Sequence, residues 1–263
     1  MPLFGAGVGA AFLLQWVAFI PAYSLRTERF FDLVGSLTFV TVTSALLWAA
    51  PERDLRAWVL ALLIAIWAAR LGTFLVLRIR RKGADGRFDA IKNRFRPFLT
   101  IWTLQGLWVS MTAGAAWASM LSTGKGPMGW VAWLGVATWV TGFLIETVAD
   151  EQKRRFRKDP ANRGRFIQSG LWSWSRHPNY FGEIILWLGV ALVAAETLQS
   201  WSRLTLVSPL IVAGLLTRVS GIPPLEQIAN QRWGDDPEYQ AYKAGTPALL
   251  PRPPARRSSP PTP

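Results

Sequence analysis

The chain has no cysteine and a single histidine, and both shortages limit the chemistry that it can perform. Without cysteine there are no disulfides, no thiolate nucleophile and no iron–sulfur cluster. One histidine, His177, excludes a histidine-rich metal site within one chain, so we expect no metal centre. Acidic residues are also few, 16 against 29 lysines and arginines, which gives a formal net charge of +13.

This basic charge is compatible with nucleic-acid binding, but the apolar content points elsewhere. The chain is 51% hydrophobic with 15 tryptophans, and its apolar residues gather in long runs. Apolar runs of about 20 residues indicate membrane-spanning helices. Because the cytoplasmic loops of membrane proteins collect lysine and arginine, membrane topology accounts for the charge, and we expect no nucleic-acid partner.

The apolar runs predict an all-α integral membrane protein, a bundle of seven transmembrane helices. The predicted spans cover residues 3–23, 31–50, 55–77, 98–121, 130–149, 180–196 and 204–219. We expect one domain over residues 1–250. Residues 251–263 are rich in proline, serine and arginine, which predicts a disordered tail.

The basic residues are distributed unevenly over the predicted loops. Residues 78–96 and 151–176, which connect spans three to four and five to six, are both rich in arginine and lysine. With seven spans these loops lie on the same side as the C-terminus. The positive-inside rule therefore predicts a cytoplasmic C-terminus and an outside N-terminus.

Charged and polar residues also collect at the predicted cytoplasmic ends of the spans. If the bundle is compact, these ends converge on a pocket rich in arginine, with a few carboxylates and an amide. Arginine matches phosphate oxygens in a bidentate manner, so a phosphate-bearing cofactor from the cytoplasm suits this pocket. The alternative is that the arginines bind anionic headgroups of membrane lipids or only set the topology.

The histidine lies between a basic segment and an apolar one, in the run Ser175-Arg176-His177-Pro178-Asn179-Tyr180-Phe181-Gly182-Glu183. A proline disfavours helix at the preceding residue and suits a first turn, so a helix is predicted to begin near Pro178. Asn179, Gly182 and Glu183 then lie on adjacent parts of that helix. The plainer interpretation is an interfacial helix start with tryptophan and tyrosine anchors, among them Trp172.

This run resembles the hallmark of bacterial membrane proteins related to steroid 5α-reductases. Residues 146–153 and 167–172 before it, and 221–226 and 239–242 after it, are similar to the same family. The resemblance spans most of the chain and is specific from about Glu146 onward. It implies an enzyme of the bacterial inner membrane that reduces an activated C=C bond with NADPH, with its cofactor site facing the cytoplasm.

The reaction that the resemblance implies is reduction of the C4=C5 bond of 3-oxo-Δ4 steroids or of similar lipophilic enones. Hydride reaches the β-carbon while the carbonyl is polarised. Asn179 and Glu183 would contact the nicotinamide carboxamide region. The cofactor-binding residues implied in full are Arg70, Arg80, Arg87, Asp150, Arg157, Arg165, His177, Asn179, Glu183, Arg218 and Glu226. The sequence leaves the oligomeric state open.

Hydride delivery builds negative charge on the carbonyl oxygen, which an aimed donor must stabilise. The family is understood to use a glutamate on the second helix and a tyrosine on the third. Here Asp32 is the nearest acid on the second span, and Trp67 lies about where the tyrosine falls. We therefore name Asp32 and Trp67, together with Glu146, as the candidate catalytic residues.

A second enzyme class fits part of the same pattern. Membrane methyltransferases of the isoprenylcysteine and phospholipid type share an Arg-His-Pro-x-Tyr run, a later arginine and a paired Glu-Glu, and they bind S-adenosylmethionine. In this chain the later acid is Glu226 alone, after Pro223-Pro224. The arginines suited to phosphate favour the reductase, and the methyltransferase remains the alternative.

Overall fold

The structure is a computed structural model that describes residues 2–82, 88–123 and 126–254, with the side chains of residues 74–82 not described. Over these residues the regular structure is helical, with no strand, as the sequence predicts. Six helical stretches in the described part are long and apolar enough to cross a membrane. They are α1 (Pro2–Ser24), α2 (Phe31–Ala49), Leu55–Thr73 of α3 (Leu55–Lys82), α5 (Trp130–Lys158), α6 (Pro178–Ala195) and Ser200–Trp233.

The last stretch is not one regular helix. It contains η4 (Ser200–Val207), α7 (Ser208–Gly214), the π-helical η5 (Leu215–Val219) and α8 (Ile222–Trp233). α8 begins at Ile222, and Pro223 and Pro224 fit its first turn because the N–H groups there have no partner within the helix. The chain then continues into α9 (Pro237–Gly245).

The predicted fourth span corresponds to α4 (Phe95–Met120), which is not among the six apolar stretches. Its sequence mixes serine, threonine, glycine and glutamine with apolar residues, and its side chains from Thr112 to Met120 are all buried. A helix that other helices cover needs a less apolar surface than one that faces lipid. The count of seven spans and the orientation of the termini stay predictions.

Two compact units make up the chain, and the predicted domain of residues 1–250 contains parts of both. Unit 1 comprises Met1–Val136 and Leu188–Pro209, and unit 2 comprises Ala137–Trp187 and Leu210–Pro263. The boundaries fall inside α5, α6 and α7, so each unit includes a part of these helices.

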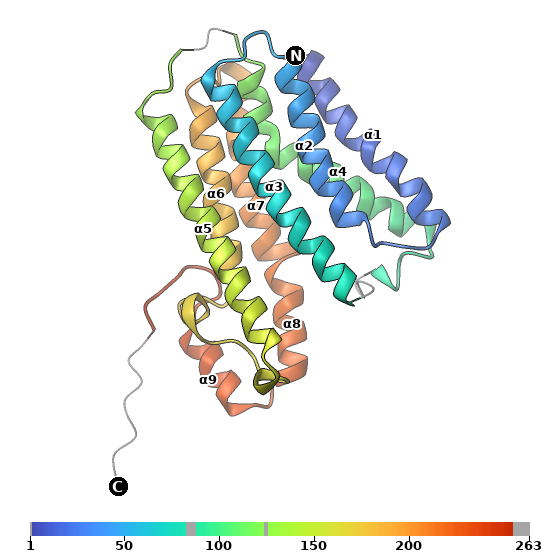
Figure 1. Cartoon of the computed structure of the whole chain (residues 1–263), viewed down its shortest axis with the longest axis vertical. Helices are drawn as coiled ribbons and strands as arrows, with labels where there is room; N and C mark the ends of the chain where they lie inside the picture. The colour runs from blue at the N-terminus through green and yellow to red at the C-terminus, as the bar shows by residue number, and fades with distance from the viewer. Residues whose placement is uncertain (1, 83–87, 124–125, 255–263) are drawn as a thin grey trace. The chain divides into compact units, whose positions relative to one another are not determined.

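In unit 1, α2 packs along α3, and α4 contacts α1, α2 and α3 (Figure 1). Polar side chains pair across these helices: Gln15 Nε2 donates to Thr38 Oγ1 over 2.8 Å, and Trp117 Nε1 donates to Thr43 Oγ1 over 2.9 Å. Such bonds satisfy polar groups where no water reaches. They fix the register of α2 against its neighbours, which matters because α2 carries Asp32.

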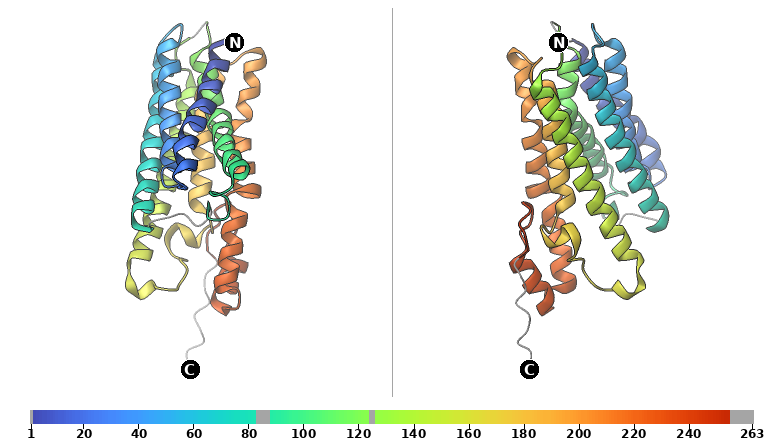
Figure 2. Two further views of the ribbon diagram at one scale, coloured as in Figure 1. Left: turned by 90° about the vertical axis from the view of Figure 1, so that its right-hand side faces the viewer. Right: turned by 60° about the vertical axis from the view of Figure 1, so that its left-hand side comes forward.

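In unit 2, glycines bring α5 and α6 close together, and Figure 2 shows the two helices side by side. An added Cβ on Gly142 would collide with the backbone of Gly182 and Leu186. One on Gly182 would collide with the backbone of Gly142 and Glu146. Small residues allow helix backbones to approach in this way within membranes. The first turns of α6 are therefore held firmly against α5.

The start of the predicted disordered tail, and the residues just before it, are hydrogen-bonded to other parts of unit 2. The N–H of Arg176 donates to Pro247 O, and the N–H of Arg252 donates to Trp174 O, both over 2.9 Å. Ser175 Oγ also donates to Leu249 O over 2.9 Å. The chain is thus held by backbone hydrogen bonds as far as Arg252, and residues 255–263 lie outside the described part.

Candidate functional site

Unit 1 contains a pocket of about 140 Å³ between α2, α3 and α4. It is lined by Asp32, Gly35, Ser36, Phe39, Trp67, Leu71, Gln105, Trp108 and Val109. Two of the three predicted catalytic residues, Asp32 and Trp67, therefore share one pocket. Glu146 belongs to unit 2.

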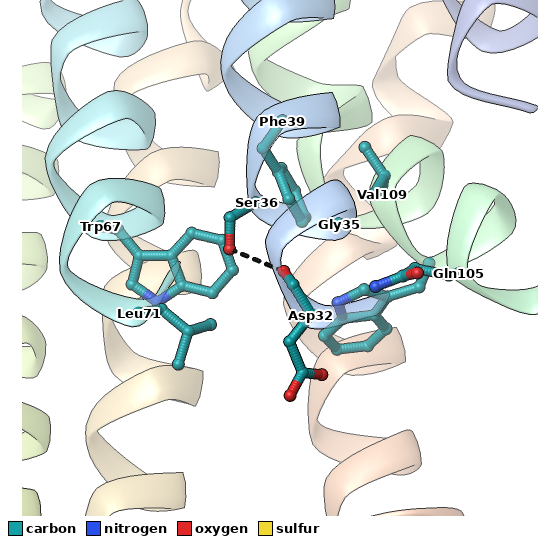
Figure 3. Close-up of a pocket in the computed structure, with 9 residues that line it drawn as sticks. Asp32, Gly35, Ser36, Phe39, Trp67, Leu71, Gln105 and Val109 are labelled. Atoms are coloured by element: carbon teal, nitrogen blue, oxygen red, sulfur yellow. Dashed lines mark hydrogen bonds between the residues drawn. The ribbon is translucent and has the colours of Figure 1, made fainter. Parts of the chain in front are cut away.

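The pocket has polar residues at one end and aromatic residues in its walls. Figure 3 shows Trp67 of α3 and Gln105 of α4 on either side of Asp32 and Ser36 of α2. Trp67 is 1% exposed and meets the ring of Phe39 edge to face, with the ring centroids 5.0 Å apart. Ser36 Oγ donates back to Asp32 O over 3.1 Å within α2. Asp32 is thus an acid of the first helical turn beside a largely apolar cavity.

Gln105 is a pocket residue that the sequence analysis missed. Its Nε2 donates to Phe31 O over 3.3 Å, and its Oε1 is buried with no hydrogen-bond partner among the described residues. The signal available in the sequence was a side-chain amide inside a predicted span, which is costly unless it has a role. Nothing in the sequence indicated that Gln105 lines the same pocket as Asp32.

Three of the predicted cofactor-binding arginines belong to unit 1, and the structure describes them to different extents. Arg70 lies on α3, three residues after Trp67, and is partly buried. Arg80 lies near the end of the same helix, where side chains are not described. Arg87 lies outside the described residues.

In unit 2, the structure brings His177 and Glu226 together. His177 Nε2 and Glu226 Oε1 are 2.9 Å apart, and His177 stacks on Tyr180 with the rings 9° from parallel. Arg176 completes the cluster, since its Nε donates to Glu226 Oε1 over 3.1 Å. Glu226 therefore has two partners, Arg176 and His177, which lie immediately before α6. Sequence reasoning missed Arg176, although it precedes His177 in the same run.

Arg176 also ties the start of α6 to the end of α9. Its Nη1 donates to the carbonyl oxygens of Lys243 and Thr246 over 2.7 and 2.8 Å. These contacts fix His177, which is 5% exposed. Burial lowers the pKa of His177, and the Glu226 carboxylate opposes this effect only in part. The imidazole is neutral at physiological pH as a result.

Two buried acceptor atoms lie at the start of α6. Asn179 Oδ1, in the first turn of α6, has no hydrogen-bond partner among the described residues, and neither has His177 Nδ1. A buried acceptor without a partner is costly, so such atoms are where a bound group is expected.

The remaining predicted residues of unit 2 differ in exposure. Glu146 on α5 is 3% exposed, and its backbone abuts Gly182 of α6. Asp150 on α5 and Glu183 on α6 are partly buried. Arg157, Arg165 and Arg218 are exposed residues.

Comparison with known proteins adds three informative relatives. An uncharacterised protein of Schizosaccharomyces pombe is 27% identical, over 56% of this chain and 52% of its own length. A 3-oxo-5-alpha-steroid 4-dehydrogenase 1 of Bos taurus is 35% identical, over 26% of each chain. A probable O-methyltransferase of Ustilaginoidea virens is 32% identical, over 26% of this chain and 24% of its own length.

The chain thus spans about half the length of the first of these relatives, 52%, and about a quarter of the steroid dehydrogenase, 26%. No solved structure matches it. The resemblance to steroid 5α-reductases that the run around His177 predicts is confirmed as sequence similarity. A family profile matches residues 18–246, most of the chain, and on that match the chain belongs to the family described as protein of unknown function DUF1295.

Proposed function

We propose that the chain is a membrane oxidoreductase that reduces the C=C bond of lipophilic enones, such as 3-oxo-Δ4 steroids, with NADPH. The observation that carries this proposal is the polar start of α6, where Asn179 Oδ1 is buried without a partner among the described residues. Similarity to steroid dehydrogenases supports the reaction class. We further propose that the cofactor site faces the cytoplasm of a bacterial inner membrane.

The residues of unit 2 fit a nicotinamide cofactor. The carboxamide of nicotinamide offers two N–H donors, and Asn179 Oδ1 is an acceptor that lacks one. Glu183, one helical turn further along α6, is a second acceptor for such groups. The exposed arginines at positions 157, 165 and 218 suit phosphates, because a guanidinium pairs with them in a bidentate manner.

When bound, NADPH supplies the hydride. The residues of the chain then have two tasks, to orient the reactants and to stabilise charge. In the pocket of unit 1, Asp32 would donate a hydrogen bond to the enone carbonyl, where negative charge develops. The apolar walls formed by Phe39 and Trp67 lower the local polarity, which would strengthen that interaction. Glu146 remains a candidate for a second proton-handling group.

His177, Arg176 and Glu226 would act indirectly. Their mutual contacts are all within 3.3 Å. The Glu226 carboxylate and His177 Nε2 are therefore already bonded to each other or to Arg176, and not placed to bind a cofactor directly. We therefore assign them to positioning the first turn of α6, and thereby Asn179. This differs from the direct contact that the resemblance implies for His177 and Glu226.

Thermal denaturation of the purified protein with either cofactor tests the proposal. A ligand that binds only the folded state raises the melting temperature. We expect NADPH to raise it and S-adenosylmethionine to leave it unchanged. In the Asn179→Leu variant, the NADPH shift should be lost while the melting temperature without ligand does not fall, because the variant removes an unsatisfied acceptor.

Turnover gives the second test. We expect NADPH oxidation coupled to reduction of a 3-oxo-Δ4 steroid, and a loss of that activity in Glu183→Gln. Similarity to an O-methyltransferase makes methyl transfer the competing function. A melting shift with S-adenosylmethionine and none with NADPH would overturn the reductase in favour of that competitor.

A further inference from the structure

A lysine of α5 carries a charge that the proposed mechanism does not use. Lys153 belongs to unit 2, lies one helical turn beyond the predicted span of residues 130–149, and is partly buried. Its Nζ lies 4.2 Å from the centroid of the Trp172 ring, which is 2% exposed. That indole is itself held in place, because its Nε1 donates to Ala149 O over 3.0 Å. The ammonium group therefore has a defined place over an aromatic face.

This ammonium group has no carboxylate partner. Among the described residues Lys153 makes no hydrogen bond and no ion pair. Its Nζ is also not one of the atoms of this part of the chain that are both unpartnered and sealed from solvent, so solvent reaches it. A cation–π contact replaces only a part of the hydration that a charge loses on burial. Lys153 therefore offers an accessible positive charge that an anion would satisfy.

The pKa of Lys153 reflects this lack of a partner. Burial lowers the pKa from the ordinary 10.5 to about 8, the charge of Arg157 acts in the same direction, and the charge of Asp150 opposes both. At pH 7 the amine is still protonated, although its surroundings stabilise the charged form poorly. Strongly shifted pKa values of this kind gather at functional sites.

The neighbours of Lys153 belong to the proposed cofactor site. Asp150 lies three residues before it on α5 and Arg157 four residues after it, so the three side chains share one face of the helix. The charge of Lys153 also acts on His177, which lies two residues before Asn179. The ammonium group is thus close to the start of α6, where the cofactor is proposed to bind.

We propose that Lys153 binds a phosphate group of the nicotinamide cofactor. The proposal rests on the proposed function in taking NADPH as the ligand. An ammonium is a compact point charge with three donors, and it is a common partner of phosphate oxygens. A phosphate would supply the negative charge that Lys153 lacks, and binding would raise the pKa of the amine back towards its ordinary value.

Cofactor binding can be measured without turnover. Fluorescence titration of the full chain in phosphatidylcholine nanodiscs would give the Kd of NADPH and of NADH. In Lys153→Met we expect the Kd of NADPH at pH 7 to rise about tenfold, the effect of one charged hydrogen bond, whereas Lys153→Arg should stay close to the wild type. An equal rise for NADH assigns the contact to the pyrophosphate, and a rise for NADPH alone assigns it to the 2′-phosphate.

The pH dependence separates a phosphate contact from a structural role. Between pH 7 and 9 the wild-type Kd should rise several-fold, because Lys153 loses its proton over this range. His177 is already neutral there, carboxylates such as Asp150 and guanidinium groups such as Arg157 keep their charges, and a phosphate is fully ionised above its second pKa of about 6. In Lys153→Arg and Lys153→Met the rise should be lost.

Lys158→Met is the matched control, because Lys158 is an exposed lysine five residues further along α5. It should leave the Kd of NADPH unchanged. An unchanged Kd in Lys153→Met would overturn the proposal, and weaker retention of added phosphatidylglycerol in that variant would then assign the contact to a lipid phosphate. If Lys153→Met does not fold, Lys153→Arg decides, since a rise in Kd as large as that of the wild type would overturn the proposal.

The two proposals fail in distinguishable ways. If the wild-type chain reduces a 3-oxo-Δ4 steroid with NADPH while the Kd depends neither on Lys153 nor on pH, this inference is wrong and the proposed function stands. If NADPH binds in a manner that depends on Lys153 while no enone is reduced, the phosphate contact stands and the reductase is wrong.

Discussion

Asp32 combines an acidic group with a position beside a largely apolar cavity, and the proposed function uses it as the hydrogen-bond donor to the carbonyl. It lies in the first turn of α2 and lines the same pocket as Trp67 and Gln105. General acid catalysis by one positioned group contributes about 10²–10⁴-fold to a rate. At the scale of single residues, a substitution of Asp32 is the most direct test of the proposed chemistry.

Replacing Asp32 with asparagine keeps the shape of the side chain and removes its proton. We expect kcat for enone reduction to fall by about 10²-fold or more, and the pH dependence of kcat to lose one of its limbs. Steady-state kinetics between pH 5 and 9 would measure both. Unchanged turnover together with an unchanged pH profile would remove Asp32 from the mechanism.

His177 predicts a pH dependence of stability. Burial lowers its pKa below the ordinary 6.5, and the charges of Arg176 and Lys153 act in the same direction, against Glu226. Below pH 6.5, therefore, the His177 side chain binds a proton more readily in the unfolded chain than in the folded chain. The free energy of unfolding should be highest above this pH and decrease as the pH falls towards the lowered value.

Melting temperatures between pH 7.5 and 5 in one detergent would show this decrease. In His177→Gln the decrease over the same range should be smaller, because the group that takes up the proton is gone. A wild-type melting temperature that rises as the pH falls from 7 to 5.5 would contradict a lowered pKa of His177.

At the scale of elements, the pairing of α5 with α6 depends on glycines. Both Gly142 and Gly182 face backbone atoms of the opposite helix. This close contact sets the position of the first turn of α6, and hence of Asn179. Helix packing is therefore tied to the proposed cofactor contact within unit 2.

A single methyl group tests that packing. Gly142→Ala should destabilise the protein by about 1–3 kcal/mol through overpacking, and it should also weaken the NADPH-dependent melting shift. Gly214→Ala is the control, since a Cβ there meets nothing within 4 Å. Alanine favours helix over glycine, so the control should be neutral or slightly stabilising. Equal effects of the two substitutions would show that α5 and α6 are not closely packed.

At the scale of the whole molecule, the uneven charge predicts an orientation. The chain carries a net charge of +13, and the basic segments 78–96 and 151–176 are expected on the cytoplasmic side with the C-terminus. A green fluorescent protein fused to the C-terminus should fluoresce in bacterial cells, and alkaline phosphatase fused there should be inactive. The opposite pair of results would place the C-terminus outside and require an even number of spans or an inverted bundle.

The sequence by itself determined the helical fold and the places where several helices begin. Apolar runs marked the six long apolar stretches of the described residues, and Pro178 marked the first residue of α6, because both depend on local chemistry. The run around His177 also pointed to the steroid 5α-reductases, a similarity that the comparisons confirm. Periodicity did not reveal that Trp172, taken as an interfacial anchor, is buried and donates to Ala149 O.

Only the tertiary structure decided which polar groups meet. The pairing of Arg176 and His177 with Glu226, and the placing of Gln105 over Gly35 beside Asp32, join residues from different helices. Such contacts depend on how helices are rotated and spaced, to within about an ångström. Hydrophobic patterns specify that a face is buried but not which side chain lies opposite, so the sequence named Asp32 and could not name its neighbour Gln105.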